Sequence, residues 1–217
     1  MTALGIGMTS ERTRMRMIEQ LRKAGIEDER VLAAMAEIPR HLFIDEGIAS
    51  RAYEDTALPI GFGQTISSPF IVALMSQWLA EKVPATGKVL EIGTGCGYQT
   101  AVLARLFKEV YSLERIASLM DKARRHLRDL RFYNVRFKHV DGHNGYPEGG
   151  PYDGILSAAA SSHVPPALKA QLASGGRLVL PVGAEDQWLF VIDRNGDEFS
   201  EERREAVRFV PLMPGLA

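Results

Sequence analysis

Three glycines within five residues, Gly93, Gly95 and Gly97, constrain this chain more than any other feature. They follow the apolar run 88–92 and precede the helical pattern 98–107, so they occupy a strand-to-helix turn. Because glycine has no Cβ, the backbone there can turn tightly and approach a ligand, toward which the free N–H groups of the helix start point. The segment therefore predicts a ligand-binding loop, and a plain structural turn is the alternative.

Short apolar runs alternate with helical patterns from Lys88 onward, which is typical of βαβ units and a mostly parallel sheet. After these units, Asn195-Gly196 favours a type I′ turn in an antiparallel hairpin. A doubly wound α/β fold is therefore expected, with a mostly parallel sheet, a C-terminal antiparallel hairpin and N-terminal helices. The expected strands are 88–92, 109–113, 135–139, 152–157, 177–181 (after a Gly175-Gly176 turn), 189–193 and a return toward 207–210, and the expected helices are 98–107, 116–130 and 166–172.

The first part of the chain has a different pattern. A helical period begins after Thr9 and Ser10 and ends at Gly25, and a second helix is capped by Asp28 and stopped by Pro39. Glycines and prolines then break the pattern up to position 69, which predicts an ordered loop region. The length of 217 residues predicts a single domain.

Charge and cysteine content exclude several classes of function. The 26 Lys and Arg residues balance 27 Asp and Glu residues, so no overall basic field attracts nucleic acid or an anionic membrane. The single cysteine, Cys96, permits neither an internal disulfide nor a thiolate zinc site and fits a reducing cytoplasm. Residues 1–8 lack a basic leader, and no apolar run reaches about 18 residues. We expect a cytoplasmic protein with no membrane partner, nucleic acid or metal.

Acidic residues lie in or after three successive strands, at Glu91, Glu114 and Asp141. A dinucleotide fingerprint requires a third glycine at the position of Tyr98, so the ligand is predicted to differ. Glu114 could accept hydrogen bonds from both hydroxyls of a ribose, and Asp141 could reach an adenine amino group. Each acid alone is explained by solvation of a strand end, but three in succession favour a nucleoside pocket.

This arrangement resembles the class I S-adenosylmethionine-dependent methyltransferases, and further segments narrow the resemblance to the protein-L-isoaspartate O-methyltransferase family. The resemblance covers the chain from about the second helix to the C-terminus. Its most specific part is the Gln-Thr-Ile-Ser block at 64–67. The segments that carry it are IPRHLF (38–43), IGFGQTISSP (60–69), YDGI (152–155), AAA (158–160), GGRLVLPVG (175–183) and RFVPL (208–212).

The resemblance implies methyl transfer from S-adenosyl-L-methionine, with S-adenosyl-L-homocysteine as product, to the free carboxylate of L-isoaspartyl residues in damaged proteins and peptides. The ester would then collapse to a succinimide and start repair. Region 1–85 would be the helical and substrate-loop part of a monomer, and 86–217 the cofactor-binding core. Ser67 would be the catalytic residue. The implied cofactor-binding residues are Thr65, Ile66, Glu91, Gly93, Thr94, Gly95, Gly97, Glu114, Asp141 and Gly142, and the implied substrate-binding residues are Val210, Pro211 and Leu212.

Several alternatives remain open at this stage. Ser67 could cap the following helix, or Ser68 could do so and leave Ser67 for the site. The basic run 122–131 fits a solvated helix face better than a nucleic-acid patch. Cys96, where the family more often has Ser or Thr, and the segment Ser161-Ser162-His163 depart from the family pattern. A methyltransferase for RNA or a small molecule, or a binding module without catalysis, would also explain the glycine loop.

Overall fold

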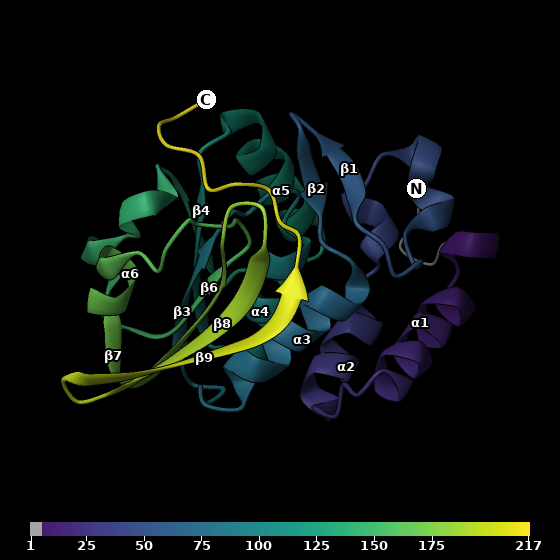
Figure 1. The fold of residues 1–217 in the computed structure, drawn as a ribbon. Helices are drawn as coiled ribbons and strands as arrows, with labels where there is room; N and C mark the ends of the chain where they lie inside the picture. The colour runs from purple at the N-terminus through teal and green to yellow at the C-terminus, as the bar shows by residue number, and fades with distance from the viewer. Residues whose placement is uncertain (1–5) are drawn as a thin grey trace.

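A central seven-stranded sheet with helices on both faces organises the computed structural model, which describes residues 6–217 (Figure 1). The strands are β1 (Leu58–Gly61), β2 (Gln64–Ile66), β3 (Lys88–Ile92), β4 (Glu109–Glu114), β5 (Val135–His139), β6 (Tyr152–Ser157), β7 (Leu172–Val182), β8 (Gln187–Asn195) and β9 (Glu198–Val207). The helices are α1 (Glu11–Lys23), α2 (Glu29–Glu37), α3 (Pro69–Ala80), α4 (Tyr98–Leu106), α5 (Ala117–Asp129) and α6 (Pro166–Ala170).

The strand order is β5-β4-β3-β6-β7-β8-β9, and β1 pairs with β2 in a separate hairpin. Strands β3 to β7 pair in parallel, whereas β8 and β9 are antiparallel and β9 forms one edge. Successive side chains point to opposite faces, and both faces are buried. Val89 belongs to the apolar cluster that contains side chains of α1 to α5, whereas Leu90 packs in a second cluster with Leu168 of α6. The predicted doubly wound α/β fold is confirmed.

The N-terminal helices share the first of these cores. Ser10 and Asp28 cap α1 and α2 as predicted, and Gly25, with φ of 99°, follows the end of α1. Ile18 of α1 and Leu189 of β8 lie in one continuous apolar cluster. This continuity supports the prediction of one domain, which stays a prediction.

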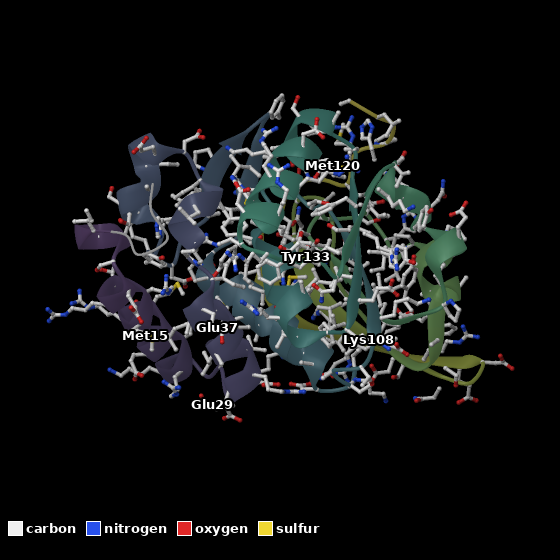
Figure 2. All side chains as sticks on the ribbon, turned by 180° about the vertical axis from the view of Figure 1, so that it is seen from behind. Met15, Glu29, Glu37, Lys108, Met120 and Tyr133 are labelled. Atoms are coloured by element: carbon white, nitrogen blue, oxygen red, sulfur yellow. The ribbon has the colours of Figure 1, made fainter. Side chains whose placement is uncertain are left out.

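The outer faces of the helices carry the charged side chains. Arg124, Arg125 and Arg128 of α5 are exposed, as expected of a solvated helix face. Figure 2 shows the molecule from behind, with Glu37 of α2 and Tyr133 labelled. Within residues 6–217, no helix combines the length and apolar character needed to cross a membrane. The expectation that 1–8 is no secretory signal falls partly on residues 1–5, which lie outside the described residues.

The region around Gly175-Gly176 differs from the prediction. The predicted helix 166–172 ends at Ala170, and β7 runs through both glycines, so the turn predicted there is wrong. The pairing of β6 with β7 shifts register between Tyr152 and Gly154, which identifies a bulge. A Cβ on Gly176 would lie 2.9 Å from the carbonyl oxygen of Asp153. The glycine therefore permits close backbone approach inside a strand.

The terminal hairpin is confirmed, but its turn lies one residue later than predicted. Asn195 pairs with Glu198, so the loop residues are Gly196 and Asp197, and only Gly196 has a positive φ. A type I′ turn requires positive φ at both loop residues, so the prediction of that type at Asn195-Gly196 is wrong. The returning strand also ends earlier, at Val207.

Beyond β9 the chain crosses the carboxyl edge of the sheet, where Figure 1 shows it as the yellow trace. The N–H of Ala160 donates to the C=O of Val210 at 2.8 Å, and the N–H of Leu212 donates to the C=O of Ala160 at 2.7 Å. These bonds hold segment 210–212 extended beside the end of β6.

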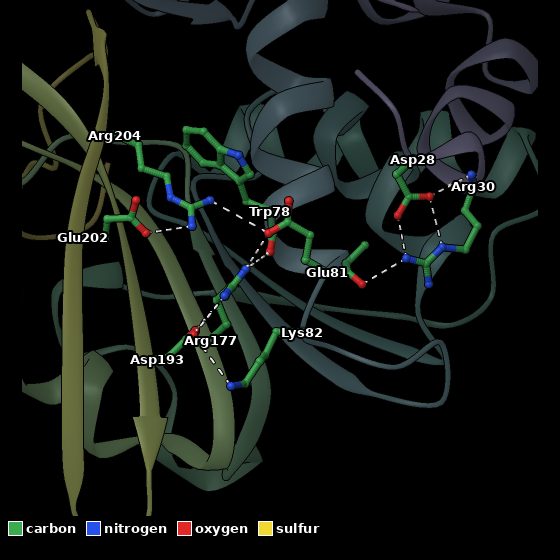
Figure 3. Close-up of polar contacts among 10 residues, drawn as sticks. Asp28, Arg30, Trp78, Glu81, Lys82, Arg177, Asp193, Glu202 and Arg204 are labelled. Carbon is green, nitrogen blue, oxygen red and sulfur yellow. Dashed lines mark hydrogen bonds and ion pairs between the residues drawn. The ribbon is translucent and has the colours of Figure 1, made fainter. Parts of the chain in front are cut away.

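An ion network joins α3 to the antiparallel part of the sheet (Figure 3). The Arg177 guanidinium, in β7, donates to both oxygens of Asp193 in β8 at 2.7 and 2.9 Å. It also donates to Glu81 at 2.9 Å and to the C=O of Trp78 at 2.7 Å. Arg204 of β9 lies over the Trp78 ring at 5.1 Å. Arg177 is only 8% exposed, so its guanidinium is largely screened from water, whereas the carboxylate of Glu81 is exposed.

We expect the substitution Arg177→Ala to lower the free energy of unfolding by about 2–3 kcal/mol, because it removes the donor to the carbonyl of Trp78 and the nearest cation of two carboxylates, which keep only the longer contacts with Lys82 and Arg204. Urea denaturation measures the change. Arg22→Ala is the control: Arg22 pairs with Glu19 and Glu29 on the surface, and no measurable change is expected.

The bond from Arg177 holds the pKa of Asp193 below its ordinary value. The stabilisation is therefore present above the ordinary carboxyl pKa and is lost as the pH falls through the lowered one. The difference between the unaltered protein and the Arg177→Ala variant should shrink in acid. A difference that stays constant would contradict the assignment.

Candidate active site

The glycine loop lies at the carboxyl end of β3 and leads into α4. Gly93, Gly95 and Gly97 have φ values of 88°, 55° and 92°, in the region that side chains rarely adopt. A Cβ on Gly97 would also lie 2.7 Å from Leu127 and 3.1 Å from the Cβ of Ala123, both on α5. The glycine at position 97 therefore lets α5 pack against the start of α4.

Glu114, at the end of β4, fixes this loop. Its Oε2 accepts the N–H of Gly95 at 2.8 Å, and its Oε1 accepts the N–H of Ile116 at 2.9 Å. The side chain borders the cavity described next and is only 6% exposed. A carboxylate oxygen can accept more than one hydrogen bond, so each oxygen of Glu114 can still accept one from a ligand.

A cavity of about 840 Å³, its open mouth included, lies at the carboxyl ends of β3, β4 and β6. Three predicted cofactor residues, Glu91, Gly97 and Asp141, do not line it. The predicted site residues that do are Thr65, Ile66, Ser67, Gly93, Thr94, Gly95, Glu114, Gly142, Val210, Pro211 and Leu212.

Glu91 is fully buried and is connected to the glycine loop only through other side chains. Its Oε2 accepts the hydroxyls of Thr100 and Ser112, both at 2.5 Å, and the Ser112 hydroxyl lies 2.6 Å from that of Thr94 in the loop. Burial raises the pKa of Glu91 to about 8, against these hydrogen bonds, and the charge of Glu114 adds to the rise. Glu91 therefore supports the loop through hydroxyls, and direct cofactor binding by it stays a prediction.

Asp141 caps the short turn after β5. Its Oδ1 accepts the N–H of His143 at 2.9 Å, and its Oδ2 accepts the N–H of Gly215 at 2.7 Å. Burial opposes ionisation of Asp141, but these bonds outweigh it and hold its pKa below the ordinary value. The structure thus places Asp141 between the cavity wall and the end of the chain, a contact that its sequence position did not indicate.

The two serines before α3 have separate roles. Ser68 is the N-cap of α3 and accepts the N–H of Ile71 at 3.4 Å, while Pro69 takes the first helical position. Ser67 does not cap the helix. It lies between the cavity and an adjoining surface groove, and among residues 6–217 its hydroxyl has no hydrogen-bond partner.

Arg40 holds the backbone of Ser67, a contact that the sequence did not predict. The guanidinium is fully buried and donates to the C=O of Ser67 at 2.7 Å and to that of Ala52 at 2.8 Å. It also lies 4.8 Å from the ring centre of Tyr98, the first residue of α4. Burial lowers the pKa of Arg40. The one available signal was its place in the IPRHLF segment, because an arginine is otherwise expected on the surface.

The adjoining groove encloses about 700 Å³, open solvent included, and shares Thr65, Ser67, Ala158 and Val210 with the cavity. Its remaining wall comes mainly from the start of α3 and the end of β9. The groove therefore connects the surface at the sheet edge with the inner cavity, and Ser67 stands at the junction.

The described residues give little support to a metal site or to Cys96 as a nucleophile. Within the described part of the chain, no group of three His, Cys, Asp or Glu side chains could hold a metal ion. The His139 ring lies 3.0 Å from the C=O of Arg115, and the His143 ring lies 2.9 Å from Asp141. Burial raises the pKa of Cys96 to about 11, so its thiol is a poor nucleophile.

A family model described as Protein-L-isoaspartate(D-aspartate) O-methyltransferase (PCMT) matches residues 12–217. The chain belongs to this family. A protein-L-isoaspartate O-methyltransferase from Dechloromonas aromatica is 60% identical over 211 residues, which cover 97% of this chain and 98% of the relative. Another, protein-L-isoaspartate O-methyltransferase 1 from Marinobacter nauticus, is 55% identical and covers 98% and 96%. The resemblance inferred from the motifs is confirmed.

Solved structures agree with this membership. A family structure from Plasmodium falciparum, in complex with S-adenosyl-L-homocysteine, superposes with a TM-score of 0.82 at 26% identity and covers 92% of this chain and 98% of that one. A second protein-L-isoaspartate O-methyltransferase gives 0.85 at 30% identity and covers 94% and 67%. The shared fold includes the sheet and the N-terminal helices.

The family uses S-adenosylmethionine, and the cavity fits that cofactor. The bent glycine loop leaves room for a ligand beside the backbone, and Glu114 offers lone pairs suited to ribose hydroxyls. The carboxylate also favours a cationic sulfonium. The cofactor-binding roles of the individual residues remain predictions.

We expect the variant Glu91→Gln to gain stability relative to the unaltered protein as the pH rises from about 5 to 8. In the folded protein Glu91 keeps its proton up to a pH of about 8, whereas in the unfolded chain it loses the proton above its ordinary pKa. Its contribution to the free energy of unfolding is therefore complete below the ordinary pKa and is lost as the pH rises to about 8. The two curves should diverge by at most about 1.4 kcal/mol per pH unit.

Urea denaturation across that pH range measures the difference. Glu37→Gln, at a side chain that is 60% exposed, should give a curve parallel to that of the unaltered protein. A parallel curve for Glu91→Gln would show that Glu91 is ionised in the folded state.

Proposed function

We propose that the protein transfers the methyl group of S-adenosylmethionine to the free carboxylate of L-isoaspartyl residues in damaged proteins and peptides, starting repair through a succinimide. The observation that carries the proposal is the position of Ser67. It joins a cavity that fits the cofactor to a groove at the surface, in a chain of the protein-L-isoaspartate O-methyltransferase family. A polypeptide in the groove could present one side chain at this junction.

The substrate supplies its own nucleophile. A side-chain or terminal carboxyl group has a pKa near 4 and is ionised at neutral pH, so no general base is needed. The hydroxyl of Ser67 can donate a hydrogen bond that orients the carboxylate. A lysine there would form a strong ion pair and reduce the nucleophilicity of the oxygen. Arg40 keeps Ser67 in place through its backbone carbonyl.

When bound, S-adenosylmethionine supplies an electrophilic methyl group on a sulfonium. The protein's task is to align the carboxylate with that group and to exclude water, an orientation effect worth several kcal/mol. Glu114, Gly93, Gly95, Thr65 and Ile66, which all line the cavity, would hold the cofactor. The carboxylate at Glu114 is already positioned by two backbone N–H groups, so it need not reorganise.

The segment after β9 would hold the peptide in an extended form. Val210 and Leu212 are fixed by Ala160 on one side, so the segment is straight before any substrate arrives. The side chain of Gln187 accepts the N–H of Phe209 at 2.7 Å and straightens the preceding residue. A rigid edge of this kind suits recognition of peptides of varied sequence through their backbones.

We also propose that the protein acts as a monomer in the cytoplasm, with no nucleic acid or membrane as partner. The single cysteine, Cys96, is buried in its free form, which suits a reducing compartment. The near-zero net charge gives no general attraction for polyanions.

Two matched peptides test the function, one with isoaspartate and one with normal aspartate at the same position. We expect base-labile label from methyl-labelled S-adenosylmethionine on the isoaspartyl peptide alone, because a methyl ester hydrolyses in base. Label on neither peptide, with S-adenosyl-L-homocysteine bound normally, would reject the proposed substrate. RNA and small-molecule acceptors would then be assayed next.

We expect Ser67→Ala to lower turnover of the isoaspartyl peptide by about 10- to 100-fold, the factor that corresponds to one lost hydrogen bond to a charged group. Calorimetry should give S-adenosyl-L-homocysteine an unchanged affinity. Ser50→Ala, at an exposed serine remote from the cavity, is the control and should retain full turnover. Unchanged turnover in Ser67→Ala would rule out the role assigned to Ser67.

A further inference from the structure

The last five residues, 213–217, run from Met213 in the wall of the cofactor cavity to Arg115, another residue of that wall, to which they are hydrogen-bonded. Before them, Pro211 and Leu212 line the cavity opposite the glycine loop, and Met213 completes that wall. Gly215 and Ala217 contact Asp141 after β5 and Arg115 after β4, so these residues run along the carboxyl edge of the parallel strands (Figure 1). We call residues 213–217 the strap.

Polar contacts fasten the strap. Gly215 donates its N–H to Asp141 at 2.7 Å and accepts from the guanidinium of Arg115 at 2.8 Å. The N–H of Ala217 donates to the C=O of Arg115 at 2.8 Å, and its C=O accepts the N–H of Ala117 at 2.9 Å. Arg115 and Ala117 lie one and three residues after Glu114, so the strap is hydrogen-bonded to the turn that begins at Glu114.

Apolar burial contributes little to this closure. Met213 and Leu216 are 47% and 58% exposed, and every strap residue is exposed. Gly215 has φ of 76°, and a Cβ there would meet no atom within 4 Å, so the backbone bends freely in open space. A segment held by a few exposed hydrogen bonds opens at low free energy compared with the sheet below it.

We propose that the strap closes over the bound cofactor and must open for cofactor and product to exchange, with Arg115 and Asp141 as positioning residues that hold it shut. The proposal rests on the cofactor cavity that the proposed function uses, and it is independent of the methyl acceptor. Asp141 then acts on the cofactor through Gly215 as well as through any direct contact.

The dissociation rate of S-adenosyl-L-homocysteine, measured by stopped-flow displacement without any acceptor, tests the strap. Removal of residues 214–217 should raise that rate about tenfold or more, since four hydrogen bonds are lost. Gly215→Pro offers the same test without shortening the chain, because proline lacks the N–H and cannot adopt φ of 76°. Arg128→Ala, at a side chain that is 73% exposed, is the control and should leave the rate unchanged.

A double-mutant cycle separates a contact of Arg115 with the strap from a contact of Arg115 with the ligand. Arg115→Ala should raise the dissociation rate in the full chain and have little further effect once residues 214–217 are removed. Amide hydrogen exchange at Gly215 and Leu216 should also slow when S-adenosyl-L-homocysteine binds. Unchanged dissociation rates in both the shortened chain and Gly215→Pro, with exchange at Gly215 insensitive to the ligand, would overturn the proposal.

Because these measurements use binding alone, they are distinct from the peptide assay. Failure of the unaltered protein to bind S-adenosyl-L-homocysteine would reject the cofactor site itself. Normal binding with no methyl transfer would reject the acceptor and leave the strap to be judged by its rates.

Discussion

The carboxylate of Glu114 is the contact on which the rest of the site depends. Its two oxygens bind N–H groups from two different turns, one leading to α4 and the other to α5. Both turns lie at the carboxyl edge of the sheet, where ligands of open α/β folds bind. Because one buried side chain holds both turns, it fixes the glycine loop relative to the starts of α4 and α5. The same side chain lies beside the turn to which residues 213–217 are hydrogen-bonded. Packing of α5 against Gly97 reinforces the same arrangement.

The N-terminal third of the chain completes the site, because it contributes Ser67 and the arginine that holds it. Arg40 comes from a short 3₁₀ segment after α2, yet its guanidinium contacts the loop of Ser67 and the first residue of α4. A buried guanidinium without a carboxylate partner is unfavourable by itself, so its hydrogen bonds and ring contact must compensate. Arg40 thus contacts both the backbone of the proposed catalytic serine and the first residue of α4, which couples the substrate side of the site to the cofactor side.

Patterns that repeat along the chain could be predicted, and features that depend on one residue's register could not. Alternation of apolar runs identified the parallel strands, and the glycine loop with its acids identified the cofactor edge. The bulge at Gly175-Gly176 was missed because paired glycines signal a turn unless the neighbouring strand is known. The hairpin turn was misplaced by one residue because Asn-Gly is typical of a type I′ loop, whereas Asn195 pairs with Glu198 and precedes the loop. The inward position of Glu91 and the bond of Asp141 to Gly215 depend on three-dimensional packing that no local pattern encodes.

Strand β9 leaves one edge of the sheet open beside the groove proposed for peptides. Such an edge can template further strands and promote aggregation, a particular hazard for a protein whose proposed substrates are damaged chains. The segment Glu201-Glu202-Arg203-Arg204-Glu205 places charge along the middle of β9, and the groove begins only beyond it, at Ala206. Like-charged neighbours and the desolvation of buried ions would oppose a long added strand. The charged middle of β9 therefore protects this edge from aggregation and leaves the groove at its end uncovered.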